Sequence, residues 1–347
     1  MRILYFGDGF LGSTSAQRAE ALKRLGHRVE LLDPYKAFQK NFVGLRGSLN
    51  FRSGYRLLQS GLEKWLKNET EKLQRPDIIW VDMGELFGRG CLEILKSLSC
   101  PIVLYNIDDP TGGRDGRRFD LLLRSIKSYD VIVVVRNSTR DELVKLGAKR
   151  VIRVFRNYDE VMHRPFDSLQ DIPQNLRSEV VFVGTWMRYE KRDEFLLRLI
   201  EKGVPVSIWG DRWQKSPNFE KLKANWRGNA LYGRDYVAAI QGSKICIGML
   251  SKGNRDDHTT RSLEVPFAGG LLCAERTDEH LELYEENVEA VFWKDADECA
   301  SVCLRLLNDE AEREQIRKNG MRKVRSLKLG HEDLCREILE HVMPVHA

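Results

Sequence analysis

Short apolar runs alternate with segments of helical periodicity along almost the whole chain. In the first half these runs are rich in β-branched residues, and the segments between them, 16–25 and 57–73 among them, are amphipathic. Such alternation is typical of β-α units that build a parallel sheet covered by helices on both faces. The strands predicted for the first half are 3–6, 29–32, 78–81, 102–105, 131–135 and 151–155.

A polar stretch with two prolines, 164–177, interrupts this pattern before a second series of the same kind begins. The strands predicted for the second half are 180–183, 206–209, 230–232, 245–247, 270–273 and 290–293. The tail, 300–341, is charged and amphipathic, which predicts two or three helices with a turn at Gly320.

The predicted fold class is therefore α/β, with two Rossmann-like, doubly wound parallel-sheet domains that face each other across a cleft. A chain of 347 residues is long enough for two such cores. We expect an N-terminal domain at 1–165, a linker at 166–178, a C-terminal domain at 179–325, and C-terminal helices at 326–347 that pack back on the N-terminal domain. In sheets of this kind, ligands bind beyond the carboxyl ends of the strands.

Composition narrows the classes of partner. The net charge of +5 comes from 56 basic and 51 acidic residues, and the basic residues are not interleaved with aromatics. This pattern favours an anionic small ligand over a nucleic acid. No apolar run is long enough to cross a bilayer and the start lacks a signal-peptide pattern, so we expect a cytoplasmic protein without a transmembrane segment, with room for peripheral membrane contact.

Neither cysteines nor histidines show metal-ligand spacing. The seven cysteines are scattered without a C-x2-C pair, so we expect reduced thiols packed in the cores. The seven histidines include no H-x3-H pair, which argues against a metal hydrolase. We therefore expect no metal.

A glycine-rich turn follows the first predicted strand. Gly7, Gly9 and Gly12 match G-x-G-x-x-G, and Asp33 ends the next strand, where a dinucleotide-binding domain places a ribose-binding acid. This favours an NAD(P)-dependent oxidoreductase. The same turn also suits any doubly wound domain, in which Gly9 and Gly12 would face the acceptor of another reaction.

The segment 261–275, RSLEVPFAGGLLCAE, is more specific. It resembles the donor-site signature of GT-B glycosyltransferases of group 1, and it is similar to the group related to the spore-maturation protein CgeB, which has R-x-F-E-x-x-x-x-G-x-x-L here. The segments 106–110, 158–165, 180–184, 208–210 and 245–248 resemble further parts of that family. The resemblance covers most of the chain.

The resemblance implies a nucleotide-sugar site in the C-terminal domain. Glu264 would accept both ribose hydroxyls, and Asp256, eight residues earlier, stands where related enzymes have a glutamate at the sugar. His258 and Arg261 would meet the diphosphate as it gains charge, as would Arg188 or Arg192 from the loop after Gly184. The remaining donor-site residues implied are Trp209, Gly210, Tyr232, Gly233 and Gly269.

The acceptor would lie on the N-terminal domain. Inverting enzymes of this architecture take the acceptor's proton with an Asp, Glu or His, and Asp108 or Asp109 is our preferred base, whereas a retaining enzyme needs none. Asp82 and Glu85 also follow a predicted strand at the acceptor side. Enzymes of this type work without a bound metal or a tightly bound cofactor.

We therefore expect a glycosyltransferase that moves a sugar from a nucleotide-diphosphate sugar, with a UDP-sugar favoured. The acceptor remains open between a glycan, a lipid-linked sugar, a protein and a small molecule. Besides the oxidoreductase, a non-catalytic nucleotide-sugar binding protein and a sugar-nucleotide epimerase remain alternatives.

Overall fold

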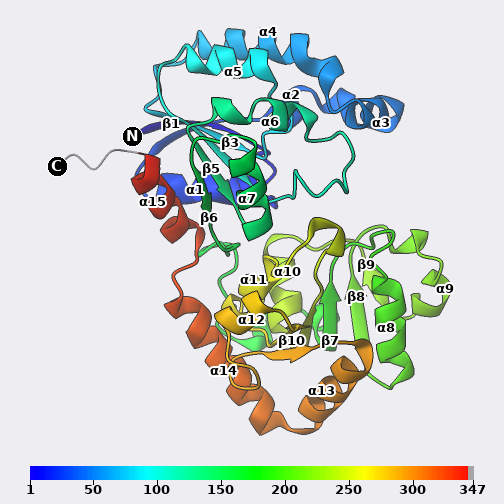
Figure 1. The fold of residues 1–347 in the computed structure, drawn as a ribbon. Helices are drawn as coiled ribbons and strands as arrows, with labels where there is room; N and C mark the ends of the chain where they lie inside the picture. Colours follow the sequence, from blue (N-terminus) through cyan, green and yellow to red (C-terminus); the bar gives the residue numbers. More distant parts are fainter. Residues whose placement is uncertain (343–347) are drawn as a thin grey trace. The chain divides into compact units, whose positions relative to one another are not determined.

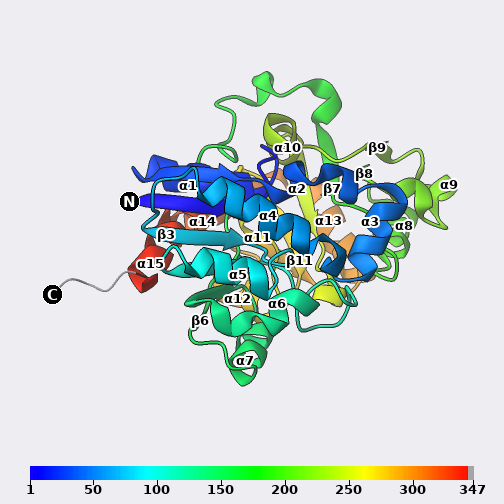
Figure 2. The same ribbon diagram turned by 90° about the horizontal axis from the view of Figure 1, so that it is seen from above.

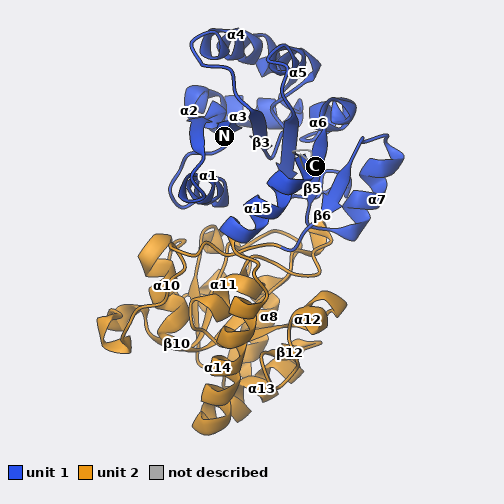
Figure 3. Cartoon of the chain, turned by 90° about the vertical axis from the view of Figure 1, so that its left-hand side faces the viewer, with its two compact units in different colours: residues 1–155, 331–347 blue, residues 156–330 orange. Residues whose placement is uncertain are grey.

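The computed structural model describes residues 1–342, which form two compact units (Figure 3). The first unit consists of residues 1–155 together with a C-terminal helix that starts at His331, and the second consists of residues 156–330. Each unit has its own parallel sheet and its own apolar core. The prediction of two Rossmann-like α/β domains, each with a parallel sheet, is confirmed.

The sheet of the first unit has the strand order β2-β1-β3-β4-β5-β6, and all neighbours are parallel. Its strands are β1 Arg2–Phe6, β2 Arg28–Leu32, β3 Ile78–Asp82, β4 Ile102–Asn106, β5 Val131–Val134 and β6 Val151–Arg153. Its α-helices are α1 Thr14–Arg24, α2 Pro34–Ala37, α3 Gly44–Arg52, α4 Gln59–Thr70, α5 Arg89–Lys96, α6 Asp120–Arg124, α7 Asn137–Lys145 and α15 His331–Val342. Helices α4 and α5 lie side by side (Figures 1 and 2).

Helix α15 completes one face of the first unit's core, although it is the last element among the described residues. Leu334 and Ile338 are buried in the same cluster as Ile3 and Trp80. The indole of Trp80 lies between the rings of Tyr5 and Tyr105, with centroids 6.2 and 6.0 Å away. Strands β3 and β4 are buried along their whole length because helices cover both faces of the sheet.

The sheet of the second unit has the strand order β12-β11-β10-β7-β8-β9, again fully parallel. Its strands are β7 Ser178–Val183, β8 Val206–Trp209, β9 Trp226–Gly228, β10 Ser243–Gly248, β11 Leu272–Glu275 and β12 Val291–Trp293. Its α-helices are α8 Arg192–Glu201, α9 Phe219–Leu222, α10 Gly233–Gln241, α11 Arg261–Phe267, α12 Asp278–Leu283, α13 Ala296–Asn308 and α14 Glu310–Ser326.

Two sequence-based expectations about local structure are wrong. The strand expected at 230–232 lies four residues earlier, as β9 at Trp226–Gly228, where the indole of Trp226 packs on the ring of Phe219. Gly320 is not in a turn but inside α14, where a Cβ would lie 2.2 Å from the carbonyl oxygen of Glu289. The glycine permits close packing of the helix on that backbone.

The segment expected as a linker, 166–178, lies within the second unit. Its apolar residues Ile172 and Leu176 are buried against Ala238 of α10. The side chain of Gln241 donates to the carbonyl oxygen of Phe166 and accepts from its N–H. The segment therefore packs as part of the domain, and the boundary between the units falls earlier, after Phe155.

Candidate functional site

Two glycines join the ends of β7 and β8 at the carboxyl edge of the second sheet. Gly184 follows β7, and its N–H donates to the carbonyl oxygen of Trp209. Gly210 follows β8 with φ +152°, and a Cβ there would lie 2.0 Å from the carbonyl oxygen of Gly184. Only glycine fits so close a backbone crossing. These two predicted donor-site glycines thus fix the loops that leave the sheet.

The carboxylate of Glu264 lies in the first turn of α11 and is almost fully buried. The hydroxyl of Tyr236, on α10, donates to its Oε2 atom at 2.7 Å. The Nε2 atom of His163 lies 3.7 Å from its Oε1 atom. Because Nδ1 of His163 accepts from the N–H of Asp159, its Nε2 atom carries the proton and faces the carboxylate. Burial and the neighbouring carboxylate raise the pKa of Tyr236, so its hydroxyl stays a donor.

The guanidinium of Arg261 lies one helical turn before Glu264. Its Nε atom donates to the carbonyl oxygen of Val183, the last residue of β7, at 2.7 Å. Among residues 1–342, no hydrogen bond or ion pair holds its two terminal nitrogens, and the side chain is partly exposed. The strand end therefore orients a cation whose terminal N–H groups remain available to an anion.

Asp256 and His258 both contact Arg156. The Oδ1 atom of Asp256 accepts from Nη2 of Arg156 at 3.0 Å, and the two side chains are at most 9% exposed. The Nε2 atom of His258 accepts from the backbone N–H of Arg156, and its Nδ1 atom lies 2.5 Å from Oε2 of Glu279. His258 is 2% exposed and both ring nitrogens are engaged. The contact with the diphosphate expected for His258 from the sequence stays a prediction.

His280 contacts the first turn of α11 through a hydrogen bond of its imidazole ring. Its Nδ1 atom donates to the carbonyl oxygen of Glu275, and its Nε2 atom accepts from the hydroxyl of Ser262, at 2.6 and 2.7 Å. Burial lowers the pKa of this imidazole, which keeps the ring neutral. Because Ser262 lies in the same turn as Glu264, the ring fixes the orientation of that turn.

The two arginines proposed for the diphosphate differ in their surroundings. Arg192 starts α8, is 9% exposed, and donates from Nη1 to the carbonyl oxygen of Thr185, so it braces the loop. Arg188 lies at the exposed tip of the same loop. The carboxylate of Glu190 anchors this tip by accepting from the N–H of Lys252 and the hydroxyl of Ser251. Of the two, Arg188 has the accessible guanidinium.

The remaining predicted donor residues lie around these loops. Trp209 ends β8 and packs beside Ile172. Tyr232 directly precedes α10 and is 52% exposed, and Gly233 starts that helix with φ +55°. Gly269 follows α11 with φ +85°, the left-handed conformation that favours glycine at a helix end.

In the first unit, the glycine-rich turn after β1 is held by hydrogen bonds to protein side chains. Asp33 accepts from the N–H of Gly9 at 3.0 Å and from the N–H of Lys36 at 2.9 Å. The carboxylate thus caps α2 and ties the turn to it, rather than standing open for a ribose. Gly12 precedes Ser13, whose hydroxyl caps α1. This arrangement disfavours the dinucleotide interpretation of the motif.

Asp82 and Glu85 both end up buried. The Oδ2 atom of Asp82 accepts from the hydroxyl of Tyr5 at 2.7 Å and lies 3.5 Å from the guanidinium of Arg18. Burial raises the pKa of Asp82 despite this cation. The Oε1 atom of Glu85 accepts from the hydroxyl of Tyr35 at 2.9 Å. Both side chains therefore stabilise the carboxyl edge of the first sheet from within.

Asp108 is more accessible than Asp109. The side chain of Asp108 is 20% exposed and accepts from Nη1 of Arg118 at 2.7 Å, while Nη2 of Arg118 donates to Glu85. Burial alone would lower the pKa of Arg118, but Glu85 and Asp108 raise it. Asp109 is 4% exposed and accepts from the hydroxyls of Thr111 and Thr139. Of these two aspartates, Asp108 is the one that solvent can reach.

Within residues 1–342, three potential metal ligands converge at one place, where the Sγ atoms of Cys273, Cys299 and Cys303 lie within 4.8 Å of one another. All three thiols are inside the apolar core of the second unit, as expected for its cysteines. Cys273 lies on β11, and Cys299 and Cys303 lie on α13, so this cluster is separate from the residues described above.

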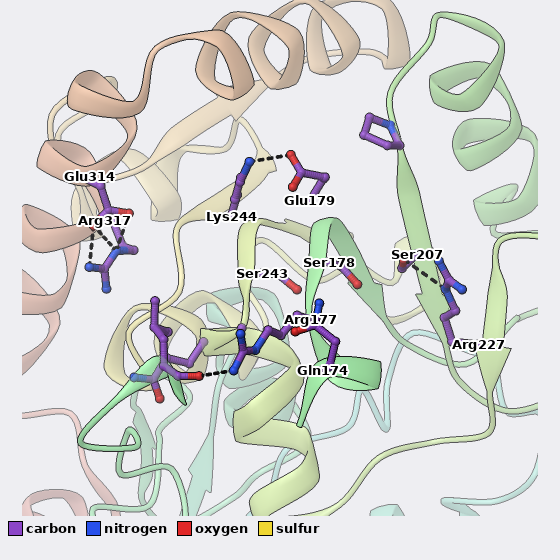
Figure 4. A pocket seen from close by; sticks show the side chains of 14 residues that line it. Gln174, Arg177, Ser178, Glu179, Ser207, Arg227, Ser243, Lys244, Glu314 and Arg317 are labelled. Atoms are coloured by element: carbon purple, nitrogen blue, oxygen red, sulfur yellow. Dashed lines mark hydrogen bonds and ion pairs between the residues drawn. The ribbon is translucent and has the colours of Figure 1, made fainter. Parts of the chain in front are cut away.

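A pocket of about 510 Å³ opens at the opposite, amino-terminal edge of the second sheet (Figure 4). Its cations are already engaged by protein groups. Lys244 donates to Glu179 at 2.7 Å, Arg227 to the hydroxyl of Ser207, and Arg177 to the carbonyl oxygen of Leu169. Because none of the predicted site residues lines this pocket, we do not assign the reaction to it.

Sequence reasoning missed the residues that orient Glu264. Tyr236 and His163 were not singled out, although His163 lies in the segment 158–165 that resembles the family. Arg156, which holds both Asp256 and His258, was also missed. The signal available was the density of polar residues in 156–163, directly after the last strand of the first unit.

Comparisons with known proteins agree with this arrangement. Residues 13–158 match the family model described as Glycosyltransferase Family 4, and residues 190–331 match the model described as Glycosyl transferase-like. No curated protein sequence is similar enough to the chain to match it.

Similar solved structures cover nearly all of the chain. Sucrose-phosphate synthase from Thermosynechococcus elongatus superposes with a TM-score of 0.71 at 14% identity, covering 98% of both chains. The Anabaena protein HepE in complex with UDP-glucose has a TM-score of 0.69 at 13% identity, covering 98% of this chain and 99% of its own. A UDP-forming α,α-trehalose-phosphate synthase from Burkholderia xenovorans has a TM-score of 0.63 at 14% identity, with the same coverage.

The two sheets and the two family models together define the class: the chain is a GT-B glycosyltransferase. The oxidoreductase interpretation is thereby set aside. The narrower likeness to the group related to CgeB stays a prediction.

Proposed function

We propose that the protein transfers a sugar from a UDP-sugar held by the second unit to an acceptor hydroxyl bound by the first unit. The observation that carries this proposal is the buried Glu264 carboxylate, oriented by Tyr236 on one oxygen, with Arg261 one turn away. The choice of uracil is supported by the similar structures, of which one holds UDP-glucose and another is named as UDP-forming.

The geometry assigns separate tasks to the donor-site residues. The Oε1 atom of Glu264 accepts no hydrogen bond from the described residues, and a carboxylate oxygen can accept from the vicinal hydroxyls of a ribose. The terminal N–H groups of Arg261, and the exposed guanidinium of Arg188, would bind the diphosphate. As the sugar leaves, negative charge grows on that diphosphate, so these cations stabilise the transition state more than the ground state.

The acceptor's oxygen forms the new bond to the anomeric carbon while the bond from that carbon to the UDP oxygen breaks. The acceptor's proton must go to a base, and Asp108 is the accessible carboxylate at the edge of the first sheet. In a retaining course the departing phosphate takes this proton instead. Every charge in this scheme is supplied by side chains, and it calls for no metal and no tightly bound cofactor.

The identity of the donor nucleotide can be tested by measuring how much each ligand raises the melting temperature of the chain. The purified chain is heated with UDP, dTDP, GDP, UDP-glucose, NAD or NADP, each at a concentration well above an expected micromolar dissociation constant. At a hundredfold excess over the dissociation constant, the bound state gains about 2.7 kcal/mol, which raises the melting temperature by several degrees. Stabilisation by UDP and UDP-sugars supports the proposal. Stabilisation by NAD or NADP alone, or by GDP in preference to UDP, contradicts it.

A further inference from the structure

Helix α3 and its flanks expose an unusual number of large apolar side chains. Among the described residues, sixteen such side chains are exposed, and five of them fall within 43–57. Of these five, the most exposed are Leu45 at 86%, Leu57 at 69%, Val43 at 66% and Leu49 at 60%. Isolated exposed leucines need no explanation, but a cluster on one short segment marks an interaction surface.

The same segment carries only positive charge. Residues 34–62 contain five basic residues and no aspartate or glutamate. Lys40, Arg46 and Arg52 are exposed and form no ion pair with the described residues, whereas Arg56 is paired with Asp120. The apolar side chains therefore stand among unneutralised cations. We call Val43, Leu45, Leu49, Leu57, Lys40, Arg46 and Arg52 the α3 surface.

The α3 surface is firmly attached to the first unit. The ring of Phe51 packs edge-on against Tyr55, Tyr55 contacts Phe42, and Phe42 contacts Tyr35, with centroids 5.4 to 6.4 Å apart. The side chain of Asn50 donates to the carbonyl oxygen of Asn41. In α3 itself only Asn50 is buried, so the exposed leucines belong to a helix that is held to the first unit by these ring contacts and by the hydrogen bond of Asn50.

We propose that the α3 surface binds the interface of a bilayer that contains anionic lipids. A helix of nine residues is far too short to span a membrane, and no described helix is long and apolar enough to do so. Lying in the interface, Leu45 and Leu49, one turn apart, would enter the acyl boundary, while Lys40, Arg46 and Arg52 would reach lipid phosphates and carboxylates. Because the α3 surface carries positive charges and no carboxylates, it should bind an anionic lipid surface more strongly than an uncharged protein surface.

The test is flotation of the full chain with vesicles in a density gradient. The vesicles are phosphatidylcholine alone or phosphatidylcholine with about 30% phosphatidylserine, a content that gives the anionic surface potential on which such segments act. The wild type floats with the anionic vesicles and not with the neutral ones, and raising the salt concentration weakens its binding because salt screens the attraction.

Two double variants probe the two halves of the surface. Leu45→Glu with Leu49→Glu, and Arg46→Glu with Arg52→Glu, are each expected to reduce the partition coefficient about tenfold or more. Because these side chains are exposed, the variants should melt like the wild type. Matched controls are Val144→Glu with Leu169→Glu, and Lys215→Glu with Lys221→Glu, exposed positions elsewhere that should leave flotation unchanged.

Three outcomes overturn the proposal. One is a wild type that does not float with anionic vesicles. Another is equal loss of flotation in the α3 variants and the controls. The third is a dimer, seen by sedimentation, that the leucine variant dissociates, which would make the surface an interface between two copies. None of these readouts depends on UDP, so the result is independent of the proposed donor.

Discussion

The hydroxyl of Tyr236 donates a 2.7 Å hydrogen bond to Oε2 of Glu264 inside the second unit. Replacing Tyr236 with Phe would leave this buried carboxylate oxygen without its donor. We expect a loss of about 1 to 3 kcal/mol in the free energy of unfolding, measured with urea. Tyr189→Phe, at a side chain that is 90% exposed, is the control and should change stability by less than about 0.5 kcal/mol. Equal stability of both variants would mean that Tyr236 does not hold the carboxylate.

The crossing of Gly184 and Gly210 gives a prediction about backbone geometry. Gly210→Ala places a methyl group 2.0 Å from the carbonyl oxygen of Gly184, so we expect a loss of about 3 kcal/mol or more in the free energy of unfolding. Gly203→Ala is the control, because Gly203 also has positive φ but meets no atom within 4 Å. Only the conformational strain of about 1 to 2 kcal/mol should appear there. Similar losses at both sites would contradict the close contact.

The neutral ring of His280 predicts a dependence of stability on pH. Its pKa in the folded chain is lowered by burial, so the unfolded chain binds more protons below the ordinary histidine pKa of about 6.5. The stability contributed by the neutral ring is present above that pH and is lost as the pH falls through the folded pKa. His280→Gln should lower the free energy of unfolding at pH 7 and make it fall less steeply as the pH drops below about 6.5. An unchanged slope would exclude this ring as the cause.

We predict that Asp108 contributes to the rate of sugar transfer and not to the affinity for the donor. Once an acceptor is known, Asp108→Asn should reduce kcat by about 10²- to 10⁴-fold, the range of general base catalysis, while UDP affinity stays the same. Asp115→Asn is the matched control, since Asp115 also pairs with Arg118 but is not our proposed base. If Asp108→Asn keeps full kcat, the acceptor's proton goes to the departing phosphate instead.

Much of the fold could be predicted because strand residues buried on both faces are visible as apolar runs. Strands such as β3 and β4 are buried throughout and coincide with the predicted 78–81 and 102–105. The short strand β9 was misplaced because Trp226 and Gly228 do not form an apolar run, whereas the sequence at 230–232 resembles one. Gly320 in α14 was misread because its reason is contact with a distant backbone, which no local pattern records.

The sequence could predict those residues of the candidate site that directly follow a strand or lie in the segment 261–275. Arg188 and Arg192 were indistinguishable in sequence, and only the hydrogen bond from Arg192 to Thr185 separates their tasks. His258 was predicted to meet the diphosphate, but the sequence did not reveal that Arg156 and Glu279, 102 and 21 residues away, contact both of its ring nitrogens. Such long-range partners depend on tertiary packing, which spacing along the chain does not reveal.

The most direct measurement is the affinity for UDP by titration calorimetry, for the wild type, for Glu264→Gln, and for the exposed control Glu282→Gln in α12. We predict that the wild type and Glu282→Gln bind UDP equally, and that Glu264→Gln binds at least about tenfold more weakly, because it loses charge-assisted bonds to the ribose worth about 1.4 kcal/mol or more. A wild type that does not bind UDP, or a Glu264→Gln variant that binds it as tightly as the wild type, would contradict a donor site built on Glu264.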